Sequence, residues 1–475
     1  MCFFKQYKQL IIKSIQLHVL FLYCQAFGQS HTDPSHQPTV WEESQGQYRV
    51  RFTNPHCKTY KYKRKTKAND GSLLTHKPKN AYCKYSDASS ASHENAPLPE
   101  LLDMIQDPDT HEIFLAFLSY SNPVIHNALC NASKERKVII NLVMDNPYKG
   151  SGRNDAEAIK NKLKYAKKLE QCAFIDAAGA TIKPNIHLRG KEGSLGFAHN
   201  KLIIINPSET TIKLAFGSAN LSSGVILHHE NWHFVTIPQN TFFAQIHLCL
   251  KEGMLKHGAK KSEYANFLSQ CRQNIIENLG YQEESDVKTF FIPAKRKLTN
   301  NKNVADGKLA TELILKQINT ADQIDLAAHR IKNKFIINAL NQSLPELKLK
   351  IVVDDDIYWR GVHDTAGFDM PNTFDEYRTV TNFASNGAFL KYVETNPSSH
   401  LLHHNKFMIF YRDNIPYGVW TGAGNFTQSA FSSNYENFYY ITIPIIVEEF
   451  AKQYQHLYQD LATAKEKLPV KNILP

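Results

Sequence analysis

What this 475-residue chain lacks excludes several architectures. It has no collagen period, no heptad array and no apolar run long enough to cross a bilayer as a helix. No residue after Cys271 is a cysteine, and no two cysteines have the CxxC spacing of a zinc site. Hydrophobic residues make up 42% of the chain and charged residues 21%, as in ordinary globular proteins. The composition therefore predicts a folded, enzyme-sized protein.

Acidic residues are absent from residues 1–28, which contain three lysines. A mostly apolar stretch, 17–24, follows these lysines, and small residues, Ala26 and Gly28, take the −3 and −1 positions of a cleavage site. We expect residues 1–28 to be a signal peptide and the protein to be secreted or periplasmic. A short amphipathic helix at the N-terminus is the alternative interpretation.

Basic residues exceed acidic ones by 55 to 45, which gives a net charge of +10, or +7 without the three lysines of the signal. This excess suits an anionic partner such as phospholipid or nucleic acid. Residues 29–95 are too polar to form a core well, and in the run 58–67 tyrosines alternate with bases. That run has two interpretations: a contact for an anionic surface, with rings available for stacking, or a solvated hairpin strand with one basic face.

Six cysteines remain after removal of the signal, an even number that is compatible with disulfides in an exported protein. We favour the pair Cys57–Cys83, because it would close a loop that is too polar to form a core. The other pairings stay open. The remaining cysteines are Cys130, Cys172, Cys249 and Cys271.

From residue 96 onward the sequence repeats itself. In each copy a strand-like run is followed by a helical pattern containing Asn-Ala-Leu, and then by an apolar strand that ends in aspartate. The offset between copies shrinks from 211 to 205 residues, as expected of a duplication with small deletions. The matched segments are 112–120 with 323–331, 122–129 with 333–340, 137–145 with 348–354, and 179–183 with 387–391.

The strand–helix–strand order predicts an α/β layer in each half. We expect a first lobe over residues 96–285 and a second over 286–475, with a polar connector at 297–307 before the second copy. Two equivalent halves can bring equivalent loops face to face around one site.

Each copy also carries the same set of polar residues. His and Lys stand two residues apart, four apolar residues follow the Lys, and a Gly falls 16 residues after it. An Asn comes three residues after that Gly, and a Glu ten or eleven residues later. A structural histidine before a buried strand would explain either copy but not their agreement. The residues are His199, Lys201, Asn220 and Glu230 in the first copy, and His404, Lys406, Asn425 and Glu436 in the second.

These residue types suit the transfer of a phosphoryl group. Two lysines and two asparagine amides can donate hydrogen bonds to phosphoryl oxygens, and the lysines provide positive charge without a metal. One histidine can attack phosphorus while the other protonates the leaving oxygen. The glutamates can hold the imidazoles in one tautomer, and pseudo-symmetry suggests that each glutamate serves the histidine of the other half.

This constellation resembles the duplicated signature of the phospholipase D superfamily, HxKxxxxD followed by GSxN and a downstream Glu. The resemblance covers about residues 96–450. It implies two pseudo-symmetric α/β/α sandwich lobes, a phosphohistidine intermediate, no metal and no cofactor, and a site between the lobes. It further implies that His199 is the nucleophile and His404 the acid, and that Ser218 joins the lysines and asparagines in binding phosphate.

The sequence departs from that signature at two positions. The family's motif aspartate is replaced by Asn206 and Tyr411, and the hairpin after the Lys is four residues longer than in the commonest members. The tyrosyl-DNA phosphodiesterase branch also lacks this aspartate and keeps His, Lys and Asn. The sub-branch and substrate therefore stay open.

Two enzymatic hypotheses follow, with a binding protein as a third. The first is a secreted phosphoric diester hydrolase of the phospholipase D type that cleaves phospholipid headgroups, in peripheral contact with a membrane surface and as a monomer. The second is a metal-independent nuclease or DNA phosphodiesterase that uses the same site. A catalytically dead binding protein is disfavoured, because all eight polar site residues are present.

Overall fold

The computed structural model describes residues 39–55, 96–148, 156–191, 195–297, 302–362, 373–395 and 401–465. The predicted signal peptide at 1–28, the Cys57–Cys83 pair and the basic run 58–67 lie outside these residues, so those predictions stay untested. In the described part of the chain, no helix has both the length and the apolar character needed to cross a membrane.

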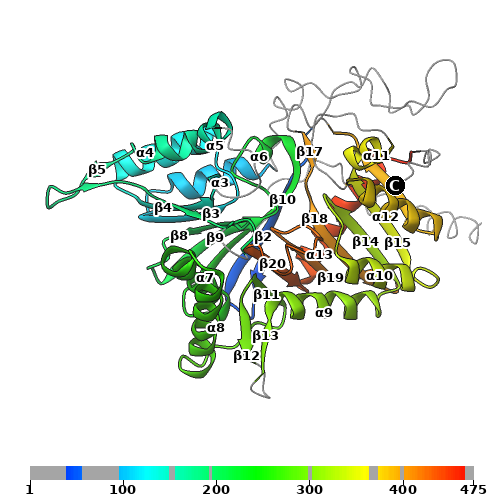
Figure 1. The fold of residues 1–475 in the computed structure, drawn as a ribbon. Coiled ribbons are helices and arrows are strands. Elements are labelled where there is room, and N and C mark those ends of the chain that lie inside the picture. The colour runs from blue at the N-terminus through cyan, green and yellow to red at the C-terminus, as the bar shows by residue number, and fades with distance from the viewer. Residues whose placement is uncertain are drawn as a thin grey trace, which may run out of the picture. The chain divides into compact units, whose positions relative to one another are not determined.

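Two mixed sheets organise the residues from Thr39 onward (Figure 1). The first has the order β1-β2-β10-β9-β8-β3-β4-β7 and the second β11-β20-β19-β18-β14-β15-β16-β21. The first-sheet strands are β1 (Thr39–Trp41), β2 (Gly46–Thr53), β3 (Glu112–Phe117), β4 (Ile139–Asp145), β7 (Asn185–Arg189), β8 (Lys201–Ile205), β9 (Thr211–Gly217) and β10 (His228–Pro238). The second-sheet strands are β11 (Val287–Ile292), β14 (Gln323–Ala328), β15 (Lys348–Asp354), β16 (Phe389–Val393), β18 (Lys406–Arg412), β19 (Ile415–Gly422), β20 (Glu436–Ile441) and β21 (Ala462–Thr463).

The sheets are built alike, which confirms the predicted duplication and α/β class. In the first, β3, β4 and β7 are parallel, and β8, β9 and β10 continue antiparallel. In the second, β14, β15 and β16 are parallel, and β18, β19 and β20 continue antiparallel. The short pairs β5 (Phe174–Ile175) with β6 (Thr181–Ile182) and β12 (Lys295–Lys297) with β13 (Asn303–Ala305) lie apart, and β17 (Leu402–His403) pairs with β10.

The sheet of the first lobe begins before residue 96, the boundary predicted from the sequence. Residues 29–95 were expected to form a segment separate from the first lobe, but β1 and β2 extend the first sheet, with β2 antiparallel to β10. In the second sheet β11 pairs with β20 in the same way. The sequence of β2 did not indicate a strand of the first sheet, because one face of this strand is polar. Arg49 and Arg51 on that face form ion pairs with Glu100.

Helices cover the sheets on both faces. Figure 1 shows α3, α4 and α5 on one side of the first sheet and α7 and α8 on the other. The matching helices α4 and α10 each begin after an asparagine, Asn122 or Asn333, whose side chain accepts backbone N–H bonds of the first turn. The helices are α3 (Pro97–Gln106), α4 (Pro123–Arg136), α5 (Ala156–Leu169), α6 (Gly224–Leu227), α7 (Phe242–Glu252), α8 (Lys261–Glu277), α9 (Asp306–Ile318), α10 (Lys334–Ser343), α11 (Asp355–Val362), α12 (Thr373–Ser385) and α13 (Pro444–His456), with π-helical turns η2 (Gly253–His257) and η4 (Leu457–Leu461).

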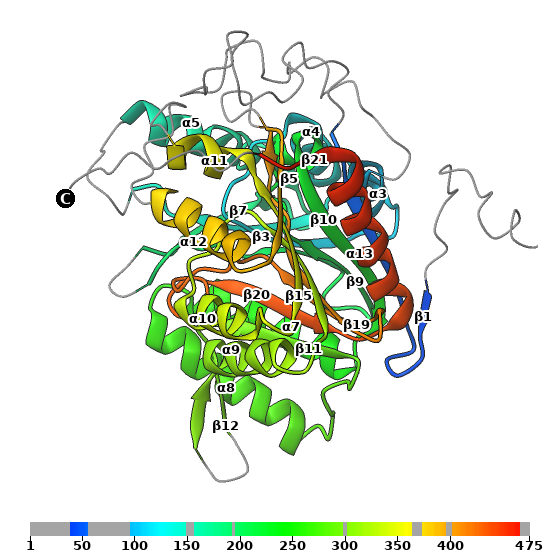
Figure 2. The ribbon, with the colours of Figure 1, turned by 90° about the vertical axis from the view of Figure 1, so that its right-hand side faces the viewer.

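One of the hydrophobic cores is shared between the lobes. Its residues come from β8, β9 and α7 of the first lobe and from β18, β19 and α13 of the second. The ring of Phe450 on α13 lies 5.1 Å from that of Phe52 on β2 and 5.0 Å from that of Phe407 on β18. Figure 2 shows α13 beside β19 of the same lobe. This shared core fixes the lobes against each other, which a site between them requires.

Among the described residues, two disulfides lie in the first lobe, at helices α4, α7 and α8. Cys130 on α4 is bonded to Cys172, and Cys249 on α7 is bonded to Cys271 on α8. By restricting the unfolded chain, each bond should add roughly 3–4 kcal/mol to the free energy of unfolding.

Candidate active site

The His-Lys segments enter the two sheets at equivalent places. Lys201 is the first residue of β8 and Lys406 the first of β18, and both strands pair with the first parallel strand of their sheet. The four apolar residues after each lysine are fully buried, as the sequence predicted. They anchor the strand, so that His199 and His404, just before the lysines, stand at its N-terminal end.

Each histidine also pairs with the opposite lobe through its backbone. The His199 N–H donates to the carbonyl of Tyr435 at 2.9 Å, and the His404 N–H donates to the carbonyl of His229 at 3.0 Å. Tyr435 comes directly before β20, and His229 is on β10. The strand that leads to each glutamate therefore runs beside the histidine of the other lobe.

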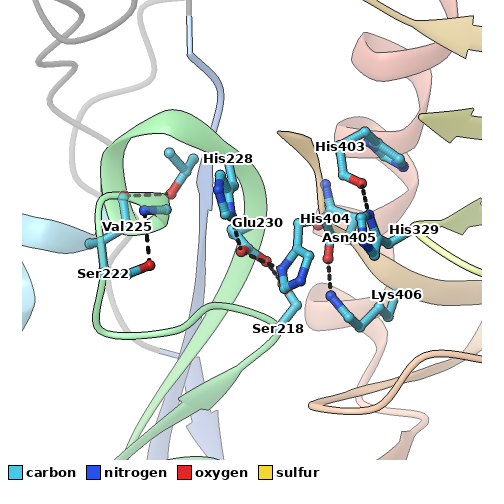
Figure 3. Close-up of polar contacts among 12 residues, drawn as sticks. Ser218, Ser222, Val225, His228, Glu230, His329, His403, His404, Asn405 and Lys406 are labelled. Atoms are coloured by element: carbon cyan, nitrogen blue, oxygen red, sulfur yellow. Dashed lines mark hydrogen bonds and ion pairs between the residues drawn. The ribbon is translucent and has the colours of Figure 1, made fainter. Parts of the chain in front are cut away.

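This pairing places each imidazole against the other lobe's carboxylate. His199 Nδ1 lies 2.8 Å from Glu436 Oε2, and His404 Nδ1 lies 2.6 Å from Glu230 Oε1 (Figure 3 shows the second pair). The predicted cross-lobe exchange of glutamates is thus confirmed. A carboxylate accepts a hydrogen bond from Nδ1–H, which leaves Nε2 of each ring to take part in chemistry.

The lysines are buried beside the histidines. Lys201 Nζ donates to the carbonyl of His199 at 2.7 Å, and Lys406 Nζ donates to the carbonyl of His404. Burial lowers the pKa of Lys201 to about 8, although Glu436 and Glu230 oppose the change, and burial also holds the pKa of Lys406 well below its usual value. A bound phosphoryl anion would favour the charged forms of both.

Burial lowers the pKa values of both histidines as well. For His199, Glu436 opposes the effect and Lys201 adds to it, so the pKa is below 6.5. For His404, Lys406 adds to the effect of burial, and the pKa is well below 6.5. Both imidazoles are therefore neutral near pH 7 before substrate binds, which is the form a nucleophile needs.

The two motif asparagines are available to a ligand. Asn220 and Asn425 follow the ends of β9 and β19, and their side-chain oxygens have no hydrogen-bond partner among the described residues. Buried polar groups are normally paired. These oxygens can only accept hydrogen bonds, so the predicted donation to a phosphoryl group would come from Nδ2 of each amide.

Ser218 takes a different position from the one expected. Its side chain is fully buried and its hydroxyl donates to Glu230 Oε2 at 2.6 Å. It therefore holds a carboxylate rather than facing the site as a phosphate ligand. The second lobe has Ala423 in the matching position, and there Asn434 Nδ2 donates to Glu436 Oε1 at 2.9 Å instead.

Two asparagine pairs at the site were not singled out from the sequence. Asn200 Nδ2 donates to Asn437 Oδ1 at 3.3 Å, and Asn231 Nδ2 donates to Asn405 Oδ1 at 3.1 Å. Asn437 Oδ1 also accepts the Lys201 N–H at 3.0 Å. Each pair crosses between the lobes. The sequence could have identified them, because both copies contain His-Asn-Lys and Glu-Asn.

The aspartates that end the repeated strands hold the backbone before each histidine. Asp145 Oδ1 accepts the Ala198 N–H at 3.0 Å, and Asp354 Oδ2 accepts the His403 N–H at 2.7 Å. The sequence showed these aspartates as part of the repeat, but their distance along the chain from the histidines hid the contact.

The two positions that depart from the resembled signature lie away from the site. Asn206 follows the far end of β8, where its Oδ1 accepts the N–H groups of His111 and Glu112 at 2.8 and 3.2 Å. The Tyr411 hydroxyl donates to Asp325 at 2.9 Å. Both residues support strand ends, so their substitution leaves the polar groups of the site intact.

Comparisons with known proteins match part of this sequence and its fold. Residues 314–458, which contain the second set of motif residues, match the family model described as "Cardiolipin synthase, PLD-like domain". The structure resembles phosphatidylserine synthase of Haemophilus influenzae Rd KW20, with a TM-score of 0.52 at 11% identity over 78% of this chain and 85% of that one. The resemblance to yeast tyrosyl-DNA phosphodiesterase has a TM-score of 0.41 at 12% identity, over 72% of this chain and 86% of that one.

A viral relative matches one short stretch. The uncharacterized protein L381 of Acanthamoeba polyphaga mimivirus is 39% identical over 57 residues, which are 12% of this chain and 20% of that protein. The match thus spans about a fifth of the relative's length.

Fold and site together define a two-lobed α/β protein whose pseudo-symmetric halves bring paired histidines, lysines and glutamates together. Residues 314–458, with the second set of motif residues, thus match a PLD-like domain, and the fold of the chain resembles that of a phosphatidylserine synthase.

Proposed function

We propose that the protein hydrolyses headgroup phosphodiesters of phospholipids through a phosphohistidine intermediate. The observation that carries this proposal is the pair of cross-lobe contacts, His199 with Glu436 and His404 with Glu230, with a buried lysine beside each histidine. The choice of a phospholipid is supported by the match of residues 314–458 to a lipid-synthase family model.

In the first step, His199 Nε2 attacks phosphorus, and the bond from phosphorus to the leaving oxygen breaks. His404, protonated in the complex, gives its Nε2 proton to that oxygen. Burial and, after it, repulsion from Lys406 lower the pKa of His404, and the charge of the bound phosphodiester offsets the repulsion. Glu230 and Glu436 accept the Nδ1–H bonds throughout and keep each ring in place.

In the second step, His404 takes a proton from water, and the water oxygen attacks the phosphohistidine. The bond from phosphorus to His199 breaks, and the enzyme returns to its starting state. An alcohol in place of water would give transfer instead of hydrolysis. Lys201, Lys406, Asn220 and Asn425 donate hydrogen bonds to the phosphoryl oxygens as charge builds up.

The test is an assay of purified protein in excess EDTA against phosphatidylcholine vesicles, with plasmid DNA as a second substrate. We expect choline release that persists in EDTA and is lost in His199→Ala and His404→Ala. Cleavage of DNA without choline release would replace the phospholipid with a nucleic acid substrate. Activity that EDTA abolishes and magnesium or zinc restores would refute the two-histidine mechanism.

A further inference from the structure

The pseudo-symmetric halves of the site differ in the side chains around their histidines. The ring centroid of His404 lies 5.2 Å from that of His228 and 4.7 Å from that of His329. In the other half, Asn434 stands two residues before Glu436, where His228 stands two before Glu230. Leu118 follows β3 as His329 follows β14. Imidazoles therefore gather around His404, whereas the matching positions near His199 carry an amide and an alkyl group.

Two of these imidazoles converge on one carboxylate oxygen. His404 Nδ1 lies 2.6 Å and His228 Nδ1 lies 3.2 Å from Glu230 Oε1 (Figure 3). One possible ligand atom from each of the three residues lies within 4.8 Å of the others, and all three side chains are buried. The Lys406 ammonium is directed to the carbonyl of His404. His329 is held by its own bond, Nδ1 to the His403 carbonyl at 3.0 Å.

We propose that His228, Glu230 and His404 bind a divalent cation of the zinc class, and that this cation inhibits the enzyme. Two imidazole nitrogens and one carboxylate oxygen are a donor set that zinc prefers, and three protein ligands leave a fourth position open. A cation bound at His404 Nδ1 displaces the proton that His404 uses in its hydrogen bond to Glu230. The ring is then no longer available to give and take protons at the reacting oxygen.

This inference concerns regulation of the site and rests on the proposed function only for its inhibitory effect. Catalysis needs no metal in the proposed mechanism, so removal of zinc should raise activity rather than abolish it. Binding itself depends only on the three ligands. It can therefore be measured without any assay of turnover.

Asn434 of the second lobe indicates which substitution of His228 is suitable for a test. Asn434 donates to Glu436 Oε1 at 2.9 Å without offering an imidazole. His228→Asn should likewise keep a donor to Glu230 while it removes one of the three ligands. The reverse change, Asn434→His, should place the same donor set around Glu436 and His199.

The direct experiment is anomalous diffraction at the zinc edge from wild-type crystals soaked in zinc chloride. We expect a peak between His228, Glu230 and His404. In parallel, EDTA-treated wild type and His228→Asn are titrated with zinc, each relative to its own activity in EDTA. The variant should need at least about 10-fold more zinc for half-inhibition.

Absence of the anomalous peak at saturating zinc would overturn the proposal, whatever the behaviour of the variant. Equal zinc sensitivity of a folded His228→Asn would also overturn it. A peak at the three residues in a protein that cleaves no phosphodiester would instead leave the cation site standing and refute the proposed function.

Discussion

Glu436 of the second lobe holds His199 of the first, with 2.8 Å between Oε2 and Nδ1. The contact exists because the backbone before β20 pairs with the backbone before β8, at the bridge between Ala198 and Tyr435. Neither lobe therefore carries the glutamate that holds its own motif histidine. Function depends on how the two copies are joined.

Glu436→Gln should lower turnover by about 10²- to 10⁴-fold with little change in KM, because the imidazole loses its orienting charge but the phosphate ligands remain. Combined with His199→Ala, the defects should be strongly non-additive, since both changes disable one pair. Steady-state kinetics of the two single variants and the double variant measure this coupling. Additive defects, with Glu230→Gln coupled to His199 instead, would contradict the cross-lobe arrangement.

Ser218→Ala tests the role that the structure gives this hydroxyl. Loss of its bond to Glu230 should reduce kcat by about 10-fold, as expected for one hydrogen bond to a charged group, and should leave KM nearly unchanged. Ala423, its counterpart in the second lobe, shows that the turn accommodates alanine. A rise in KM at constant kcat would instead mean that Ser218 binds substrate phosphate.

The pH dependence of kcat/KM should be bell-shaped. Lys201 and His404 must both be protonated. Because burial and Lys406 hold the pKa of His404 well below 6.5 in the free enzyme, kcat/KM should already fall with rising pH below pH 8, and loss of the Lys201 proton, with a pKa of about 8, makes the fall steeper. His199 must be neutral to attack, and because its pKa is lowered from 6.5, the acidic limb should lie below pH 6.5. In kcat the alkaline limb should move to higher pH, because bound phosphate raises the lysine pKa. An alkaline limb unchanged in position between the two profiles would contradict this assignment.

Asn437→Ala should lower the free energy of unfolding by about 1–3 kcal/mol, because it leaves the buried Asn200 amide and the Lys201 N–H unpaired. Asn278→Ala is a suitable control, since the Asn278 side chain bonds to Asn274 at an exposed helix end. Urea denaturation of both variants gives the comparison. Equal stabilities would show that the cross-lobe asparagines contribute nothing to joining the lobes.

Much of this arrangement could be predicted from the sequence because the chain repeats it. Agreement between the copies identified the eight polar motif residues, and pseudo-symmetry predicted the exchange of glutamates. The strand β2 was missed because its polar side, with Arg49 and Arg51, hides its place in a sheet. The bond of Ser218 to Glu230 could not be predicted, since a motif does not show which way a hydroxyl points.

Residues that differ between the two copies cannot be found by comparing the copies. His228 and Asn434 occupy matching positions but differ in type, so comparison of the copies gave no signal for either. Their importance comes from the carboxylates that they contact, Glu230 and Glu436, and only the fold brings those contacts into view.

The central claim, a covalent intermediate on His199, is tested most directly by acid quench of wild type with radiolabelled phosphodiester, followed by peptide mapping. The mechanism predicts label on His199 and no label in His199→Ala. In His404→Ala, label should accumulate when the leaving group of the substrate needs no protonation, because no residue then activates the water that releases the phosphoryl group. Label on His404 that persists in His199→Ala would reverse the two roles. Turnover without label on either histidine would contradict the account.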